Sequence, residues 1–218
     1  MEENEQKIGF LFDLDGVIID SESEYSRIWS QINKEYPSGI ANLEQVIKGT
    51  TLSKILNDFF PTDEIREKVS KRLHELENQM VYEYLPYARD FLLELKKRKL
   101  PCALVTSSDN EKMNHLKEEI PGLFDFFDFI ITGDLVKTSK PSPEGYLLGA
   151  SKLNINPNNC VVFEDSLQGV TAGHNSGAYV VGIAGTLPAE QLTPFSDIVI
   201  NNFNELEIDN LIQKLKKR

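Results

Sequence analysis

Short runs of consecutive apolar residues recur along the chain, and each run is bounded by residues that favour turns. Runs of this length and flanking composition predict buried β-strands. They cover residues 8–12, 101–106, 129–132, 160–163, 178–183 and 197–200. Because the runs are continuously apolar rather than alternating, they are typical of a parallel sheet that is covered on both faces.

Segments with a helical spacing of apolar residues lie between these runs. In residues 144–153, for example, Tyr146, Ala150 and Leu153 recur every three or four positions. The predicted helices cover residues 87–97, 110–119, 144–153, 167–176 and 204–217. Strands that alternate with helices indicate βαβ units. The predicted fold class is therefore α/β, with a Rossmann-like parallel sheet and helices on both of its faces.

One interval between predicted strands is too long for this pattern. About 90 residues separate the first strand from the second, whereas a βαβ unit takes about 30. The excess falls in residues 22–85, which show no convincing strand. Its helical patterns cover residues 25–32, 43–48, 52–59 and 63–84. We therefore expect an inserted all-helical cap over residues 22–85 and a catalytic core formed by residues 1–21 and 86–218.

The position of the insert gives it a functional meaning. Binding sites of open α/β sheets lie at the carboxyl ends of the strands, and an insert directly after the first strand would cover that place. The alternative is a solvated helical ornament without a role in binding. If the insert is a cap, hinges are expected near residues 20–22 and 85–87.

The charge balance excludes some classes of partner. Net charge is −11, from 23 basic and 34 acidic residues, so no net positive field would attract nucleic acid or an anionic membrane. A small phosphorylated substrate needs only a local positive site and is not excluded. The polar N-terminal residues do not resemble a signal peptide, and no apolar run approaches the roughly 18 residues of a membrane span. These features predict a cytoplasmic protein, with a monomer as the default.

Two pairs of acidic residues follow predicted strands. Asp13 and Asp15 come after residues 8–12, alternate with apolar residues and precede Gly16, so both carboxylates can point toward one mouth of the sheet. Glu164 and Asp165 follow residues 160–163. Crowded carboxylates favour a hard cation such as Mg²⁺ between them. The alternative for the first pair is ordinary turn chemistry, in which Asp and Gly are common.

Other strand ends carry hydroxyl groups and a lysine. Thr106, Ser107 and Ser108 end the second predicted strand, and Asn110 stands near the start of the following helix. Hydroxyls and free backbone N–H groups there suit a phosphate, although a helix cap explains some of them equally well. Lys140 precedes a proline, which keeps the chain extended. An oxygen-rich metal site that faces hydroxyls and a lysine predicts phosphate chemistry.

Three longer strings carry a resemblance to a known family: FDLDGVIIDSE, SKPSPEGY and FEDSLQGV. They resemble the haloacid dehalogenase superfamily of phosphohydrolases, in the β-phosphoglucomutase-like branch with a helical cap. The resemblance implies that Asp13 is the nucleophile, which forms an aspartyl-phosphate, and that Asp15 is the general acid and base. It also implies that Mg²⁺ is bound by Asp13, by the backbone carbonyl of Asp15, and by Glu164 and Asp165.

The remaining roles follow from the same resemblance. Thr106, Ser107 and Lys140 would hold the oxygens of the transferred phosphoryl group, and Ser108 and Asn110 would lie near the substrate. Lys48 is a further substrate-binding candidate, because Lys48 and Gly49 match a Lys-Gly pair in the cap loop of the family's mutases.

The same mutases indicate which reaction to expect. They carry a histidine where Tyr25 stands here, and an arginine after the Lys-Gly pair that has no counterpart in this loop. A bisphosphate intermediate needs two anchored phosphates, so we expect a Mg²⁺-dependent phosphatase that acts on a small phosphorylated metabolite such as a sugar phosphate. A β-phosphoglucomutase-type mutase and a pyrophosphatase are alternative enzymes. A catalytically silent phosphometabolite-binding regulatory protein is an alternative of another class.

Several residues are expected to have no catalytic role. His74, His115 and His174 do not pair with one another at metal-ligand spacing, and His74 lies on what reads as a solvated helix face. Cys102 and Cys160 lie in apolar runs and are expected to be buried, reduced thiols.

Overall fold

A single parallel sheet forms the centre of the molecule. The structure, a computed structural model, describes residues 7–218, apart from the side chains of residues 22 and 23. The sheet has six strands in the order β5-β4-β1-β6-β7-β8. Their bounds are β1 (Gly9–Phe12), β4 (Cys102–Val105), β5 (Phe129–Ile131), β6 (Cys160–Glu164), β7 (Tyr179–Ile183) and β8 (Ile198–Ile200). All the predicted strands are present, and the predicted α/β fold is confirmed.

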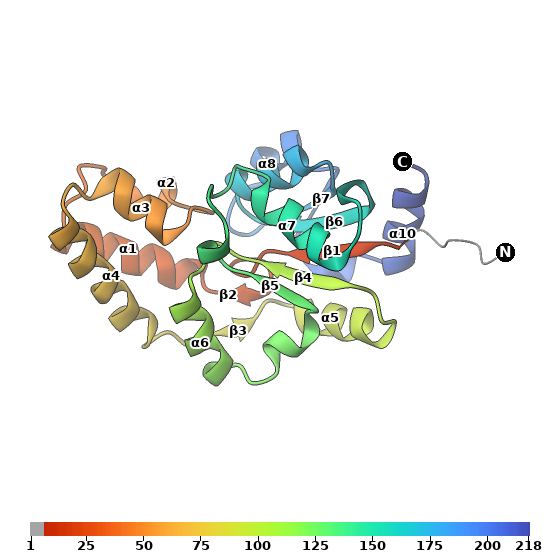
Figure 1. The fold of residues 1–218 in the computed structure, drawn as a ribbon, viewed down its shortest axis with the longest axis horizontal. Helices are drawn as coiled ribbons and strands as arrows, with labels where there is room; N and C mark the ends of the chain where they lie inside the picture. Colours follow the sequence, from red (N-terminus) through yellow and green to blue (C-terminus); the bar gives the residue numbers. More distant parts are fainter. Residues whose placement is uncertain (1–6) are drawn as a thin grey trace.

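Helices cover both faces of this sheet (Figure 1). One face is covered by α5 (Ala88–Lys97), α6 (Asn110–Glu119) and α10 (Ile208–Lys216). The other is covered by α7 (Glu144–Leu153), α8 (Leu167–Ser176) and α9 (Ala189–Leu192). Side chains of β1 alternate between the two cores, since Phe10 and Phe12 pack on the first side and Leu11 on the second.

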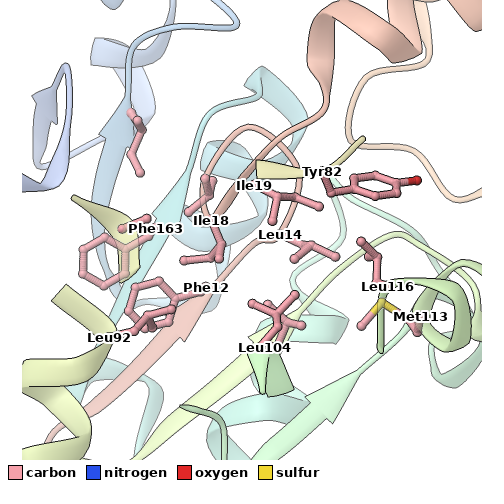
Figure 2. Packing of buried hydrophobic residues seen from close by; sticks show 14 of the residues in the cluster. Phe12, Leu14, Ile18, Ile19, Tyr82, Leu92, Leu104, Met113, Leu116 and Phe163 are labelled. Carbon is pink, nitrogen blue, oxygen red and sulfur yellow. The ribbon is translucent and has the colours of Figure 1, made fainter. Parts of the chain in front are cut away.

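Aromatic packing holds β1 and β6 side by side near their carboxyl ends. The rings of Phe12 and Phe163 stack with centroids 4.4 Å apart, and Phe91 of α5 meets Phe163 edge-on at 5.6 Å. Figure 2 shows Phe12 and Phe163 together, with Leu104 of β4 beside them. Burial of each such ring contributes about 1.5–3 kcal/mol, so the residues directly after these strands start from a rigid base.

The helices α1 to α4 lie beyond the carboxyl ends of the strands, at one end of the molecule (Figure 1). We call residues 22–77, which contain them, the helical insert. Its helices are α1 (Glu22–Glu35), α2 (Leu43–Val46), α3 (Leu52–Phe59) and α4 (Asp63–Glu77). Thr51 and Thr62 cap α3 and α4, because each hydroxyl accepts a hydrogen bond from the backbone N–H three residues on. The insert is helical, as predicted.

The end of the insert differs from the prediction. A helix was expected over residues 63–84, but α4 ends at Glu77, and β3 (Glu83–Tyr84) pairs antiparallel with β2 (Ile19–Asp20). The expectation of no strand in residues 22–85 was therefore wrong. Burial alternates after α4, with Met80 and Tyr82 buried and Val81 and Glu83 exposed, which is the period of a strand rather than a helix.

The C-terminal helix also begins later than predicted, at Ile208 instead of residue 204. The backbone and side-chain amides of Asn201 both donate to Glu205 Oε1, each at 3.0 Å. These local bonds compete with an α-helix and leave a 3₁₀ turn. The 3₁₀ turns are η1 (Leu123–Phe126), η2 (Gly133–Leu135), η3 (Pro157–Asn159), η4 (Thr193–Phe195) and η5 (Phe203–Glu205).

Two further expectations concern burial and membranes. Cys102 and Cys160 are buried free thiols, as predicted. Within residues 7–218, none of the helices combines the length and the apolar character needed to cross a bilayer.

Candidate active site

Acidic and hydroxyl side chains meet where β1, β4 and β6 end. Asp13 follows β1, Thr106 follows β4, Glu164 is the last residue of β6, and Asp165 comes next. The backbone N–H of Asp13 donates to the carbonyl of Phe163 at 3.0 Å, which continues the ladder between β1 and β6. These are the strands between which the chain order reverses, the usual ligand position of a doubly wound sheet.

Lys140 joins the two acidic pairs. Its ammonium group donates to Asp13 Oδ1 at 2.6 Å and also to Glu164 Oε1. It reaches the carbonyl of Val105 at 3.3 Å, and the ring of Tyr146 lies 5.0 Å away. Lys140 is only 7% exposed, so it is a buried component of the site rather than a surface lysine. Its predicted position next to Asp13 is therefore supported by direct contacts.

Glu164 lies beneath the site. It is fully buried, and Oε2 accepts hydrogen bonds from the backbone N–H groups of Asp165 at 3.1 Å and Ser166 at 3.4 Å. Tyr146 donates to Oε1 at 2.6 Å. A Cβ at Gly169 would come within 2.0 Å of this carboxylate, so only glycine leaves room for it beside α8.

The donor set of the site suits a hard divalent cation. Asp13, Glu164 and Asp165 each offer a carboxylate oxygen, and these oxygens lie within 4.8 Å of one another. All three residues are buried, and oxygen-only ligands of this kind are typical of Mg²⁺. Gly16 covers Asp165 with φ +72°, and a Cβ there would fall 1.9 Å from Asp165 Oδ2. The residues present thus fit a magnesium ion.

Burial changes the acidity of the proposed nucleophile. Desolvation raises the pKa of Asp13 from 3.8 to about 8; Lys140 opposes the rise and Glu164 adds to it. A cation bound between the carboxylates favours their charged forms and would return Asp13 to the ionised state that a nucleophile needs.

Asp15 has a different environment from Asp13. Lys112 of α6 donates to both of its carboxylate oxygens, at 2.7 and 2.6 Å. Ser108 donates to Oδ2 at 3.1 Å, and Ser21 donates to Oδ1. Lys112 and two serines therefore hold the carboxylate of Asp15, which is not a member of the three-carboxylate cluster. Its predicted part in metal binding, through the backbone carbonyl, stays a prediction.

The hydroxyl groups of Thr106, Ser107 and Ser108 each have a different hydrogen-bond partner. Thr106 Oγ1 accepts the backbone N–H of Ser108 at 3.0 Å, which shapes the turn after β4. Ser107 Oγ donates to the carbonyl of Gly49, in the helical insert, at 3.0 Å. Ser108 contacts Asp15. All three line the same cavity as Asp13.

Asn110 is not brought into the site. Its backbone N–H donates to Asp134 Oδ2 at 2.8 Å, and its side-chain oxygen accepts a hydrogen bond from Thr132 at 3.3 Å. Asn110 begins α6 and is exposed, and its predicted substrate contact has no support from the structure.

A cavity of about 120 Å³ lies between the helical insert and the sheet. Its floor includes Asp13, Asp15 and Asp165, and its roof includes residues of α1, α3 and α4. Lys48, predicted to bind substrate, lines the cavity together with Gly49. Further lining residues are Tyr25, Trp29, Glu44, Ile47, Leu52, Ile55, Leu73, Glu77 and Lys112.

Sequence reasoning missed Lys112. It is 4% exposed, and its ammonium group lies 4.2 Å from the centroid of the Tyr25 ring. Tyr25 in turn donates to Glu77 Oε1 at 2.6 Å, so the helical insert meets the core through charged and aromatic groups. One signal was available, because Lys112 stands four residues before Leu116 and therefore on the buried face of α6.

The interpretation of His74 as part of a solvated face was wrong. Its side chain is 12% exposed, and its ring nitrogens lie 3.1 Å from Asp109 Oδ2 and 3.1 Å from Glu111 Oε2. Glu77 Oε2 lies 3.8 Å away. The hydrogen bond to Asp109 is the main cause of a raised pKa at His74. Long-range packing of α4 against α6 buries this position, which the local sequence does not show.

Comparison with known proteins gives the family. A model of haloacid dehalogenase-like hydrolases matches residues 9–177, from β1 to the residue after α8. The chain belongs to the haloacid dehalogenase-like hydrolases. In this hydrolase the matched segment includes Asp13, Thr106, Lys140 and both acidic residues at the end of β6, so the resemblance inferred from the sequence is confirmed.

Individual relatives cover most of this hydrolase. The phosphorylated carbohydrates phosphatase of Thermotoga maritima is 34% identical over 175 residues, 77% of this chain and 80% of the relative. Hexitol phosphatase A of Escherichia coli is 29% identical over 213 residues, 92% of this chain and 93% of that protein. A crystal structure of β-phosphoglucomutase from Clostridium difficile has a TM-score of 0.80 at 26% identity, and covers 97% of this chain and 98% of its own.

Proposed function

We propose that this hydrolase is a Mg²⁺-dependent phosphatase that removes phosphate from a small phosphorylated metabolite through an aspartyl-phosphate on Asp13. The observation that carries the proposal is the different environment of two carboxylates at one cavity. Asp13 contacts Lys140 among clustered acids, whereas Asp15 contacts Lys112 and two serines. Two carboxylates held apart in this way suit two different roles.

In the first step, an Asp13 carboxylate oxygen attacks phosphorus and the ester bond to the leaving group breaks. Asp15, in its protonated form, gives its proton to the leaving oxygen, so that an alcohol departs. Lys140 offsets negative charge at the reacting group, and the hydroxyls of Thr106 and Ser107 line the space that the phosphoryl oxygens would occupy.

In the second step, water attacks the phosphorus of the aspartyl-phosphate. Asp15 now accepts the proton of that water, and inorganic phosphate leaves. Asp13 and Asp15 line the same cavity, and the proposed reaction places Asp15 on the side from which both the leaving alcohol and the water would come. One carboxylate thus moves protons in both steps.

Mg²⁺ would be held by Asp13, Glu164 and Asp165, with the backbone carbonyl of Asp15 as a further proposed ligand. When bound, the ion offsets phosphate charge and polarises the phosphoryl group. Lys140 supplies a second, permanent positive charge in contact with Asp13 and Glu164.

We propose that the substrate is a phosphorylated carbohydrate. Two relatives named above act, according to their names, on phosphorylated carbohydrates and hexitol phosphates. The cavity is consistent with a polar leaving group, since Glu44, Lys48 and Glu77 line it beside Trp29. We also propose that residues 22–85 act as a cap whose movement admits the substrate, with the β2 and β3 segments as the crossing between cap and core.

The structure favours hydrolysis over phosphate transfer between sugar positions. A mutase needs a second phosphate anchor in the cap. Within the described residues, Lys48 is the one cationic side chain that the cap contributes to the cavity lining, and Lys112 of the core is already engaged by Asp15. The cap thus offers a single cation where the family's mutases have a Lys-Gly pair followed by an arginine. Incubation with β-glucose 1-phosphate and a bisphosphate primer separates the two reactions, because a phosphatase releases free phosphate and a mutase forms the 6-phosphate.

A substrate screen tests the proposal. The protein is incubated with p-nitrophenyl phosphate and a panel of sugar and polyol phosphates, with Mg²⁺ or with EDTA, and released phosphate is measured. We expect hydrolysis in Mg²⁺ and its loss in EDTA. Absence of hydrolysis for the whole panel in Mg²⁺ would contradict the proposed function.

A further inference from the structure

Lys112 is the only lysine of α6 that points into the site within the described residues, and nothing in the proposed chemistry yet uses it. Its ammonium group donates to both oxygens of Asp15, at 2.7 and 2.6 Å. With Ser21 and Ser108 it occupies the lone pairs through which a carboxylate accepts hydrogen bonds. The orientation of Asp15 is therefore set mainly by Lys112.

The helical insert holds Lys112 in this position. The Tyr25 ring of α1 lies 4.2 Å from the ammonium group, and Tyr82 lies at 6.0 Å. Glu77 of α4 interacts with the charge of Lys112 and accepts a hydrogen bond from Tyr25 at 2.6 Å. A buried lysine on a core helix thus has its second set of partners in the insert, and would lose them if the insert moved away.

We propose that Lys112 is a positioning residue for the hydrolytic second step: it holds Asp15 as an oriented carboxylate that accepts a proton from water, and it does so when Tyr25 and Glu77 enclose it. The inference rests on the proposed function, because it assigns a task within the two-step phosphatase reaction. An ammonium group that donates to both oxygens of a carboxylate fixes the direction in which that carboxylate faces, through two charge-assisted hydrogen bonds.

A water oxygen attacks phosphorus, and Asp15 takes one proton of that water. The bond between phosphorus and the Asp13 oxygen breaks, and its electron pair returns to the Asp13 carboxylate. Inorganic phosphate and protonated Asp15 result, and this proton is the one that the next leaving group receives. Ser108, whose 3.1 Å hydrogen bond is the longest of the side-chain hydrogen bonds to Asp15, is the group that the water would displace.

If Lys112 positions Asp15 for the second step, removing Lys112 should affect the two steps of the reaction unequally. An aryl phosphate such as p-nitrophenyl phosphate has a good leaving group, so its first step needs little help from an acid. kcat/KM for this substrate reports the first step alone, whereas kcat also includes hydrolysis of the aspartyl-phosphate. Loss of Lys112 should therefore slow the second step and leave the first nearly unchanged.

The test is Lys112→Met with p-nitrophenyl phosphate and Mg²⁺, followed in the steady state and by stopped flow. We expect kcat to fall by about tenfold to a hundredfold, which is within the range of acid–base effects, and KM to fall in proportion. A nitrophenolate burst approaching one per active site should appear. Lys117→Met, an exposed lysine on the same helix, should leave both constants unchanged. A merely structural role would not separate kcat from kcat/KM.

A second variant shows whether a loss of activity in Lys112→Met comes only from destabilisation of the fold. Lys112→Met alone leaves the buried Glu77 without the opposing charge of Lys112. The double variant Lys112→Met, Glu77→Gln removes both charges, and the same burst and the same split between kcat and kcat/KM are expected. A combination of Lys112→Met with Asp15→Asn should be no slower than Asp15→Asn alone, because Lys112 acts through Asp15.

The outcomes separate the two proposals. Hydrolysis by the unchanged protein supports the phosphatase, whatever Lys112 does. If Lys112→Met and the double variant lower kcat/KM as much as kcat, or lower neither, the assignment of Lys112 is overturned while the phosphatase stands. If the unchanged protein releases no phosphate from any substrate, the proposed function fails first.

Discussion

The ammonium group of Lys140 lies 2.6 Å from Asp13 Oδ1 and contacts Glu164 as well, so one buried cation connects acidic residues at the ends of two neighbouring strands. Both carboxylates would be costly to bury without it. The contact therefore stabilises the fold at the same place where it prepares the chemistry, and it links the effects of substitution on stability and on activity.

Lys140→Met should reduce both properties. Removal of one partner of a buried charge cluster leaves the others uncompensated, at a cost of about 3–5 kcal/mol in the free energy of unfolding. Phosphate release should fall at least about a hundredfold, because the charge at the reacting group is lost. Urea unfolding and phosphate release measure the two effects. Lys152→Met, an exposed lysine of α7, is the matched control, and an equal effect there would contradict the assignment.

Gly16→Ala should impair the metal site more than the fold. Gly16 has φ +72°, and an added Cβ would fall 1.9 Å from Asp165 Oδ2. Gly39 has φ +84° with open space around it, so Gly39→Ala should lose only the backbone preference, about 1–2 kcal/mol. Phosphate release at increasing Mg²⁺ compares the two variants. We expect a higher Mg²⁺ requirement or no activity for Gly16→Ala alone; equal activity of both variants would argue against the close packing of Gly16 on Asp165.

Mg²⁺ should stabilise the protein even without substrate. A ligand that binds only the folded state adds about 2.7 kcal/mol to the free energy of unfolding when its concentration is a hundredfold above Kd. The midpoint temperature of thermal unfolding rises as a result. Thermal scans with Mg²⁺ and with EDTA measure the shift. Asp165→Asn removes one of the three clustered carboxylates, and we expect the shift to shrink strongly in that variant. A shift of the same size in both proteins would place the ion elsewhere.

The stability that His74 contributes should depend on pH. The hydrogen bond to Asp109 raises the pKa of His74 above 6.5 in the folded protein, and Glu77 and Glu111 act in the same direction. A raised folded-state pKa means that the contribution is fully present below about pH 6.5 and is lost as the pH rises through the folded pKa. His74→Gln should therefore destabilise the protein more at about pH 6 than at about pH 9.

Urea unfolding at several pH values measures this difference, and His174→Gln, at an exposed position of α8, is the control. A pH-independent loss in His74→Gln would mean that packing, not charge, is what His74 contributes.

Much of the fold could be predicted because its signals are local. Continuous apolar runs identified every strand of the parallel sheet, and the spacing between them identified the insert. Asp13, Lys140 and Asp165 could be placed together because residues after parallel strands meet at one edge. The β3 strand was missed because it has two residues and follows directly on a strong helical pattern.

The contacts between the insert and the core could not be predicted in the same way. Lys112 and His74 are charged residues in helices, and their local sequences look solvated. They are buried only because α4, α1 and α6 come together over distances of more than thirty residues along the chain. Asn110 shows the converse, since a residue next to a predicted site can point to a neighbouring loop instead.

The most direct test of the central claim is phosphate release by Asp13→Asn in saturating Mg²⁺, with a substrate that the unchanged protein hydrolyses. The amide is similar in size to the carboxylate but does not attack phosphorus, so we predict a loss of at least about a thousandfold with the fold retained by circular dichroism. Activity within tenfold of the unchanged protein would contradict the account, because phosphate would then leave without a covalent bond to Asp13.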